Sequence, residues 1–416
     1  MQLASPIRAL SVLAIAAVAL TGLGVGSANA EATVGLSNAV AVKSSWAKEA
    51  AGPASVCNQR ARRVLRRVKQ RSAARTRRRA ARRARAIQRR CLRRLRRSTA
   101  QGRSSQAPAQ PSAAPLTVGI DGGHDEWWSD TIDARAEFGA AVTRHEWDAP
   151  YEPVDAKDEF VLTAATQVHT RIHALLAGND LGDAGAYRDW VVAFVKRYGP
   201  GGAFWDAHPE VDESRYAISS IELGNEPYFG EMSATEYAST VRPTLDAVKA
   251  LGAPVKVILP SYIHGSRTTW IDTLYERIPD LNELFYAFAD HPYWYGHDPA
   301  EGGDSGPLAR IETLRQRMAH HGAGEKPIYI TEYGESTASC GEECVSEAVQ
   351  AAHLQTMLDA VVSRRDWGIE LISVFQLHDW ATGSNDREQQ FGLLRQDGSE
   401  KPSYAIVEDA VQRYRG

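Results

Sequence analysis

The stretch SSIELGNEPYFG, residues 219–230, places an acidic side chain at the end of an apolar run. Ile218, Ile221 and Leu223 are typical of a buried strand, and Glu226 follows close behind them. A strand that is buried along its length and opens into a cleft at its last residues would explain this order. The stretch therefore predicts a sheet whose strand ends carry polar groups.

From residue 116 onward, short β-rich runs alternate with amphipathic helical patterns, which indicates an α/β fold with a parallel sheet. Eight strands are predicted, at residues 117–121, 140–146, 171–176, 217–223, 255–260, 285–289, 328–331 and 370–376. Helices are predicted between them, for example at residues 186–198, 234–251 and 345–363, and a last one at 404–414. Eight β/α units in about 300 residues predict a (β/α)8 TIM barrel over residues 116–416. A doubly wound open sheet is the alternative.

A second glutamate ends another predicted strand, because Glu332 lies in IYITEYG, residues 328–334. In a TIM barrel the carboxyl ends of all strands meet at one face, and strands four and seven lie on facing sides of it. Cleaving a glycosidic bond needs two carboxyl groups, of which one gives a proton and the other attacks or stabilises the anomeric carbon. We therefore predict that Glu226 and Glu332 flank such a bond as catalytic residues.

Three motifs resemble the clan A glycoside hydrolases, which are cellulase-like (β/α)8 retaining enzymes. They are GNEP at residues 224–227, TEYG at 331–334 and HPYWYG at 291–296. The resemblance spans residues 116–416 and includes the ending GLLRQDGSEKPSYAIVEDAV. The run WVVAFVKRYGPGGAFWDAHPE is similar to bacterial members of families 5 and 39 and does not distinguish between them.

The resemblance implies a role for each matching residue. Glu226 would be the acid/base and Glu332 the nucleophile, while Asn225 would hydrogen-bond the sugar 2-hydroxyl. Tyr293 would hold the nucleophile, and His291 is a further candidate for substrate binding in the same motif. The implied activity is a β-glycosidase or endo-β-glycanase acting on a plant or microbial polysaccharide or oligosaccharide by double displacement.

The chain departs from the clan pattern at strand eight, where many members have a tryptophan that stacks on the sugar. Here the stretch is FQLHDW, so either Trp380 plays that role or His378 occupies the place. His145 and Trp128 lie near other strand ends and are candidates for contacts with the substrate, because aromatic faces pack on pyranose rings and polar tips bind hydroxyls. Ordinary packing is the alternative for each of them.

Residues 1–30 have the composition of a secretory signal peptide, with basic Arg8, an apolar run at 9–20 and small residues at 28–30. A membrane anchor is the alternative, but the apolar run is short of the roughly 20 residues that span a bilayer. We expect a secreted or cell-wall-associated protein with no stable membrane span after cleavage.

The four cysteines suit an oxidising compartment, and their positions suggest two local disulfides. The predicted pairs are Cys340 with Cys344 and Cys57 with Cys91. Free thiols are the alternative.

Residues 31–97 form a basic N-terminal segment, in which positions 60–97 hold 20 of the 48 Lys and Arg residues and no acid. Helical spacing of its apolar residues predicts a hairpin of two helices, whereas the repulsion between like charges favours disorder. Positions 60–97 would bind an anionic cell-wall polymer, and the lack of aromatic residues among their basic side chains disfavours nucleic acid. The segment would otherwise be a solvated tether. Residues 98–115 have the composition of a linker.

Other kinds of chemistry find little support in the sequence. GDSGP at residues 303–307 resembles a serine-protease signature, but no histidine and aspartate can be placed around it. No zinc, phosphate-loop or dinucleotide motif occurs in the mature chain, so we expect no metal and no cofactor. The alternative from another class is a catalytically silent glycan-binding surface protein built on a degenerate barrel.

Overall fold

The computed structural model of the chain describes residues 115–122, 128–176, 181–229, 232–263, 269–301 and 306–416. The predictions for the signal peptide, the basic segment with its Cys57–Cys91 pair and the linker up to residue 114 lie outside these ranges. Within them, no helix is both long enough and apolar enough to cross a membrane.

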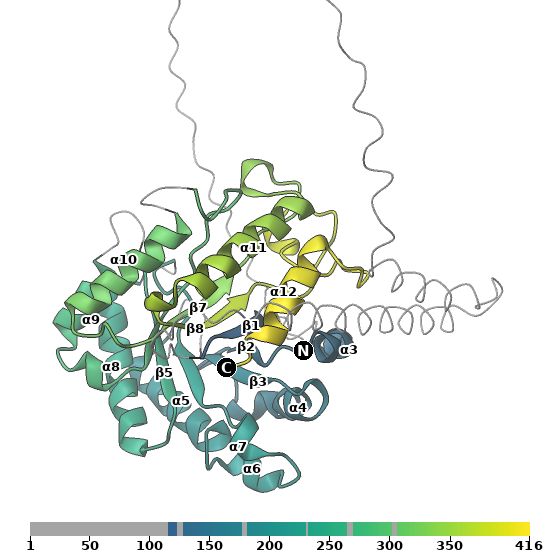
Figure 1. The fold of residues 1–416 in the computed structure, drawn as a ribbon. Helices are drawn as coiled ribbons and strands as arrows, with labels where there is room; N and C mark the ends of the chain where they lie inside the picture. Colours follow the sequence, from purple (N-terminus) through teal and green to yellow (C-terminus); the bar gives the residue numbers. More distant parts are fainter. Residues whose placement is uncertain (1–114, 123–127, 177–180, 230–231, 264–268, 302–305) are drawn as a thin grey trace, which may run out of the picture. The chain divides into compact units, whose positions relative to one another are not determined.

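Eight parallel strands close into a barrel, in which each strand pairs with its neighbours in sequence and β1 pairs with β8. Figure 1 shows the strands at the centre with the helices around them. The strands are β1 Thr117–Asp121, β2 Val142–Trp147, β3 Arg171–Leu176, β4 Ser220–Leu223, β5 Lys256–Pro260, β6 Ala287–Asp290, β7 Ile328–Tyr333 and β8 Ile369–Val374. The predicted (β/α)8 TIM barrel is confirmed. The β1–β8 pair excludes an open sheet, which would leave both edge strands unpaired.

Helices on the outside of the barrel connect the strands. Their bounds are α3 Trp128–Phe138, α4 Asp158–Thr163, α5 Ala184–Tyr198, α6 Ala203–Ala207, α7 Glu213–Tyr216, α8 Ala234–Leu251, α9 Trp270–Arg277, α10 Pro307–His320, α11 Glu347–Ser363 and α12 Pro402–Arg413. Local signals explain the ends of α8: Ser233 and Glu236 form a capping box at its start, and Gly252, with φ 64°, ends it. The predicted helices are confirmed with shifts of one or two residues.

Strand β4 is shorter than the sequence predicts, because residues 217–219 lie outside it, although the Ser219 carbonyl still accepts from the Lys256 amide of β5 at 2.8 Å. The helix α7 ends just before them, and the Ile218 amide donates to the carbonyl of Tyr198 at the end of α5. Ile218 is fully buried, so the apolar character that predicted a strand comes from packing against the helices.

The strands alternate between a face that packs on the helices and a face that points into the barrel. Ile221 of β4 belongs to the main core between sheet and helices, whereas Ile258 and Leu371 belong to a small separate apolar cluster. Glu222, next to Ile221, instead bonds Arg144 of β2. The barrel interior therefore contains charged groups beneath its carboxyl-terminal mouth.

Two buried tyrosines of α5 and α8 bind the carboxyl ends of β3 and β4. The Tyr187 hydroxyl donates to the carbonyl of Leu176 at 2.8 Å, and the Tyr237 hydroxyl donates to the carbonyl of Leu223 at 2.7 Å. These bonds add donors to main-chain oxygens at the ends of the two strands, where the Leu176 carbonyl also accepts from the Gly224 amide at 3.0 Å. They fix the helices against the strand end that leads to Glu226.

A buried ion pair and a disulfide hold the loops at the carboxyl end of the barrel. Lys401, just before α12, donates from Nζ to Asp379 at 2.7 Å and to Thr337 Oγ1 at 2.8 Å. The ammonium thus joins the loops that follow β7 and β8. Cys340 and Cys344 form the predicted disulfide in the β7 loop.

Replacing Tyr237 by phenylalanine tests the contribution of these strand-end bonds. We expect Tyr237→Phe to lower the free energy of unfolding by about 1–3 kcal/mol, because the buried carbonyl of Leu223 loses its donor. Urea denaturation followed by circular dichroism measures the change. Ser239→Ala, on the exposed face of the same helix, is the control and should alter stability little. Wild-type stability in Tyr237→Phe would contradict the assignment.

Candidate active site

Glu226 and Glu332 line one cleft of about 900 Å³ at the carboxyl-terminal mouth of the barrel. Glu332 is part of β7, and Glu226 lies three residues beyond β4. The cleft is lined by further acidic and aromatic side chains, namely Asp121, Glu146, Asp148, Glu152, Glu388, Phe229, Tyr293, Tyr295, Phe375, Trp380 and Phe391. The two glutamates that the sequence predicts thus share one cavity.

The backbone of the GNEP motif turns sharply after β4. Gly224 has φ 91°, which glycine adopts without strain, and Glu226 has φ 42°, which is uncommon for a residue with a side chain. A hydrogen bond from the Phe229 amide to the Glu226 carbonyl, 2.8 Å long, closes the turn that follows. The left-handed backbone at Glu226 is the kind of local strain that accompanies functional positions.

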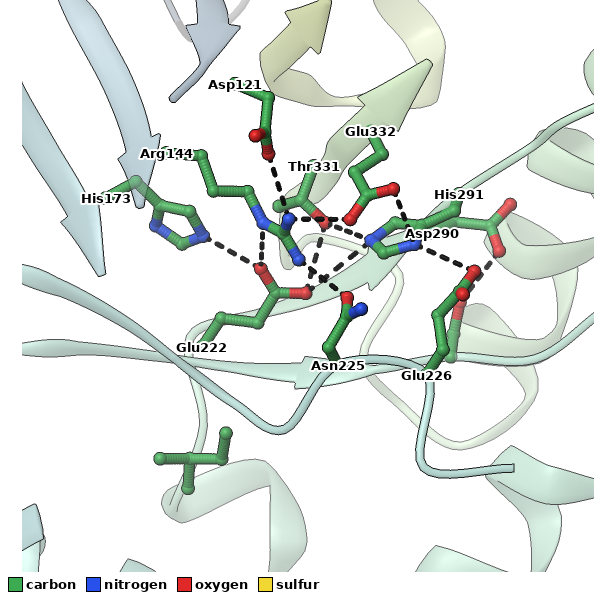
Figure 2. Close-up of polar contacts among 12 residues, drawn as sticks. Asp121, Arg144, His173, Glu222, Asn225, Glu226, Asp290, His291, Thr331 and Glu332 are labelled. Atoms are coloured by element: carbon green, nitrogen blue, oxygen red, sulfur yellow. Dashed lines mark hydrogen bonds and ion pairs between the residues drawn. The ribbon is translucent and has the colours of Figure 1, made fainter. Parts of the chain in front are cut away.

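Arg144 of β2 joins four side chains at the mouth of the barrel, as Figure 2 shows. Its Nη1 donates to Glu332 at 2.6 Å and to Asp121 at 3.0 Å. Nε donates to Glu222 at 2.9 Å, and Nη2 donates to the side-chain oxygen of Asn225 at 2.9 Å. Because the guanidinium is buried and always charged, it places a positive charge against Glu332 and orients the amide of Asn225.

Glu222 is a fully buried carboxylate beneath the two cleft glutamates. Besides the bond from Arg144, it accepts from His173 Nε2 at 3.2 Å and from the Thr331 hydroxyl at 3.1 Å. Burial alone would raise the pKa of Glu222, but the Arg144 charge and the His173 bond hold that pKa well below its usual range. Glu222 is therefore the fixed negative charge that balances Arg144.

His291 contacts both cleft glutamates from the loop that follows β6. Its Nδ1 lies 3.0 Å from Glu226 Oε1 and 3.7 Å from Glu332 Oε2, and its Nε2 lies 2.9 Å from Thr331 Oγ1. Burial alone would lower the pKa of His291, but the charges of Glu332 and Glu226 raise that pKa to about 9. The ring thus places positive charge and a proton beside Glu226.

Tyr293 binds the second glutamate, because its hydroxyl donates to Glu332 Oε2 at 3.0 Å. Burial and the nearby Glu332 charge raise the pKa of Tyr293 well above its usual value, so the phenol stays a donor. Glu332 thus receives bonds from Arg144 and Tyr293, whereas the Glu226 carboxylate contacts His291. The two carboxylates have different surroundings, as an acid and a nucleophile require.

Aromatic side chains form one wall of the cleft, on the loops after β6 and β8. Tyr295 stacks on Tyr293 with ring centroids 5.0 Å apart, and Phe375 and Phe391 meet edge to face at 5.2 Å. Gly334 of the TEYG motif makes this packing possible, since a Cβ there would lie 1.9 Å from the carbonyl oxygen of Phe375. Such a wall suits the apolar face of a sugar ring.

At strand eight, Trp380 lines the cleft, and His378 is not among the described residues that do. Burial lowers the pKa of His378 to about 4, so the ring is neutral. Phe375, the first residue of FQLHDW, lines the cleft with Trp380, and their rings meet edge to face at 6.4 Å. The role of Trp380 as a sugar platform remains a prediction.

His145 and Trp128 occupy different positions relative to the cleft. His145 of β2 lines it, stacks on Phe160 with centroids 3.8 Å apart and meets Trp147 edge to face. Trp128 is the first residue of α3, and its side chain lies outside the described part of the structure. Contacts of either residue with a substrate remain predictions.

Glu146 adds a titratable group to the cleft. Glu146 lines the open cleft, but the surrounding protein partly desolvates its carboxyl group. The nearby negative charges of Asp121 and Glu332 also disfavour a negative charge on Glu146. These effects outweigh the Arg144 charge and raise the pKa of Glu146 to about 7. Glu146 therefore changes charge near neutral pH.

Sequence reasoning missed Arg144, Glu222, His173 and Thr331 as parts of this site. Each is a charged or polar side chain inside a predicted buried strand. Charged residues are rarely buried unless they are paired. That rule applied to Arg144 and Glu222 would have pointed to an interior ion pair, although not to its partners on other strands.

No group of three or more potential ligands is placed to hold a metal ion among the residues that the structure describes. The acidic side chains of the cleft have separate cationic partners: Arg144 pairs with Asp121 and Glu332, His291 with Glu226, Lys157 with Glu152 and Arg387 with Glu388. The chemistry available from the described side chains is proton transfer and nucleophilic attack by carboxylates.

No family model and no curated protein matches the chain. Solved structures do match. A family 39 glycoside hydrolase from the gut symbiont Bacteroides cellulosilyticus WH2 is 17% identical, with a TM-score of 0.53 over 72% of this chain and 64% of that chain. A glucosidase from Croceicoccus marinus is 15% identical, with a TM-score of 0.53 over 74% of this chain and 69% of that one.

A third match is a family 51 alpha-L-arabinofuranosidase from Bifidobacterium longum, at 15% identity and a TM-score of 0.50 over 74% of this chain and 75% of that chain. The chain thus spans slightly less than two thirds of the first of these structures. At these identities the likeness concerns the fold, and the resemblance to the clan A glycoside hydrolase barrel is confirmed at that level.

Removing the charge of Arg144 tests the buried network. We expect Arg144→Met to lower the free energy of unfolding by about 3–5 kcal/mol, since it leaves Glu222 buried without its cation. Lys249→Gln is the control, because it breaks a surface ion pair with Glu283 and should leave the urea midpoint nearly unchanged. Equal midpoints for wild type and Arg144→Met would contradict the proposed balance of charges.

Proposed function

We propose that the chain is a secreted glycoside hydrolase that cleaves β-glycosidic bonds with retention of configuration. The observation that carries the proposal is the pair Glu226 and Glu332, which face one cleft from β4 and β7 and are held in different ways. Glu332 is fixed as an anion by Arg144 and Tyr293, as a nucleophile requires. Glu226 lies against His291, with which it can exchange a proton.

In the proposed mechanism Glu332 attacks the anomeric carbon while Glu226 protonates the departing oxygen. The bond between the carbon and the leaving oxygen breaks as an ester to Glu332 forms. Glu226 then takes a proton from water, which attacks the anomeric carbon and releases Glu332. Asn225, oriented by Arg144, would bind the sugar 2-hydroxyl beside the nucleophile.

The closeness of the two carboxylates supports retention over inversion. Oε1 of Glu226 and Oε2 of Glu332 both lie near one nitrogen of His291, at 3.0 and 3.7 Å. The separation of these two oxygens cannot exceed the sum of the two distances. That sum is at the lower edge of the roughly 6.5–9.5 Å that separates the two carboxyl groups of inverting enzymes.

The charge and the aromatic groups of the cleft support a neutral sugar as substrate. Seven acidic side chains line the cleft against Arg144, Lys157 and Arg387. An anionic sugar would meet net repulsion there. On the side of Glu226, Phe229 lines the cleft and exposes 60% of its surface, which suits it to stack on the leaving group.

The alternative of a silent glycan-binding protein finds no support in the comparisons. The groups that hold both glutamates are also in place, which a degenerate barrel has no need to keep. Export, association with the cell wall and binding of an anionic polymer by residues 60–97 remain predictions from the sequence.

Variants of the two glutamates test the proposed roles. Glu332→Gln should lose at least about 10³-fold in kcat, because no nucleophile remains for the first step. Glu226→Ala should still form the glycosyl-enzyme from an activated aryl β-glycoside, since a good leaving group needs no acid. Added azide should then speed its turnover and yield a β-glycosyl azide.

Steady-state kinetics with product analysis by NMR follows both variants, and a panel of neutral β-glycans identifies the substrate. Glu388→Gln, which also removes a carboxylate of the cleft wall, is the matched control. Normal activity in Glu332→Gln would overturn the assignment. Binding without hydrolysis across the panel would revive the silent alternative.

Phe229 is expected to recognise the leaving group. Phe229→Ala should lower kcat/KM for a β-linked oligosaccharide by about 2- to 10-fold, the value of one stacking contact. Phe229→Tyr keeps an aromatic face and should recover most of the loss. A glycosyl fluoride, whose leaving group is too small to stack, should be hydrolysed equally by all three proteins. A uniform loss on both substrates would show that Phe229 does not act through the leaving group.

A further inference from the structure

A continuous chain of buried contacts links Glu226 to Glu222 through two other side chains (Figure 2). Glu226 Oε1 lies 3.0 Å from His291 Nδ1, and His291 Nε2 lies 2.9 Å from Thr331 Oγ1. The Thr331 hydroxyl in turn donates to Glu222 Oε1 at 3.1 Å. Thr331 and Glu222 are almost completely buried, so water does not compete for these bonds.

The direction of each bond follows from counting hydrogens. Glu222 is a carboxylate, because Arg144 and His173 hold its pKa low, and it can only accept. The Thr331 hydroxyl has one hydrogen, which it gives to Glu222. Nε2 of His291 must therefore carry a hydrogen and donate it to Thr331.

This assignment leaves Nδ1 of His291 as the atom that changes its protonation. When the ring is neutral, Nδ1 accepts, and only a protonated Glu226 can complete the bond. When the ring is a cation, Nδ1 donates to the Glu226 carboxylate. In both states a single proton lies between Nδ1 and Oε1.

We propose that Thr331, anchored on Glu222, is a positioning residue that fixes the Nε2 proton of His291 and so makes the His291–Glu226 pair the holder of one exchangeable proton. The inference rests on the proposed glycosidase function. In the first step the pair gives this proton to the leaving oxygen, and in the second it takes one from the attacking water. The pair thus ends each turnover with the proton count with which it began.

The surroundings of His291 determine how the pair responds to pH. Charged or titratable groups face the ring from β2, β4, β6, β7 and the loops that follow them, namely Arg144, Glu222, Glu226, Tyr293 and Glu332. Burial and the Arg144 charge lower the pKa of His291, but the Glu332 and Glu226 carboxylates outweigh them and raise it to about 9, against an ordinary value of 6.5. The pair keeps its proton below that pH and loses it above, so hydrolysis of substrates that need an acid should fall on the alkaline side.

Two variants of Thr331 separate the hydroxyl from the packing around it. Thr331→Val keeps the shape and removes the hydroxyl, and Thr331→Ser keeps the hydroxyl. In Thr331→Val the Nε2–H loses its acceptor, which disfavours the cationic ring, so the alkaline midpoint of kcat/KM should move to lower pH by about half a unit or more. Thr331→Ser should restore the wild-type midpoint.

The choice of substrate distinguishes this role from damage to the neighbouring Glu332. Thr331→Val should lose about 10-fold or more on a β-glycoside with an alkyl or sugar leaving group, which needs the acid. On an activated aryl β-glycoside its first step, measured by the burst in a stopped-flow experiment, should lose much less. An equal loss on both substrates with an unchanged pH midpoint would show a merely structural role and overturn the proposal.

A spectroscopic measurement on the full chain does not depend on activity. Long-range ¹H–¹⁵N spectra of protein labelled with ¹⁵N-histidine report the protonation of each ring nitrogen, and His291→Gln identifies the signals of His291. We expect Nε2 to keep its proton across the pH range, while Nδ1 alone titrates. Loss of the proton from Nε2 would overturn the proposal. If instead no β-glycan is cleaved and Nε2 stays protonated, the proposed function fails and the hydrogen-bond assignment stands.

Discussion

The buried ion pair between Arg144 and Glu222 determines the arrangement of the whole mouth of the barrel. Bringing both charges out of water has a free-energy cost of several kcal/mol each, which their mutual attraction offsets only if the remaining hydrogen bonds are made. The structure makes them: Arg144 also bonds Asp121, Asn225 and Glu332. Strands β1, β2, β4 and β7 are thereby tied together at the level where the chemistry is proposed.

The same pair separates the two cleft glutamates chemically. Glu332 accepts a charge-assisted hydrogen bond from Arg144 and a hydrogen bond from the Tyr293 hydroxyl. Both bonds stabilise a negative charge on Glu332. The Glu226 carboxylate instead faces the imidazole of His291. Glu332 thus contacts the guanidinium of Arg144, which cannot lose its proton, whereas Glu226 contacts the imidazole of His291, which can.

The fold and the main acidic pair could be predicted from the sequence, because the information for them is local. Apolar runs mark the strands, and the GNEP and TEYG turns mark the two ends at which a carboxylate emerges. The predicted start of β4 was wrong, because Ile218 is buried against helices and does not belong to the strand. A sequence pattern shows that a residue is apolar but not which element it packs against. Arg144 and Glu222 were missed for a related reason. A charged residue within a buried strand implies an oppositely charged partner, but here that partner lies on a strand distant in the sequence.

The balance of charge in the cleft explains why a proton must be held there. Around Arg144 stand the carboxyl groups of Asp121, Glu222 and Glu332, and Glu226 lies close by, so one permanent cation faces several acids. Because the pKa of Glu146 is raised to about 7, this carboxyl group is mostly protonated and uncharged below that pH. His291 reduces the net negative charge of the site by carrying a positive charge. The carboxylates of Glu332 and Glu226 keep its ring cationic up to about pH 9. The acids that make the cleft suitable for two-carboxylate chemistry are thus also the groups that retain the proton which that chemistry consumes.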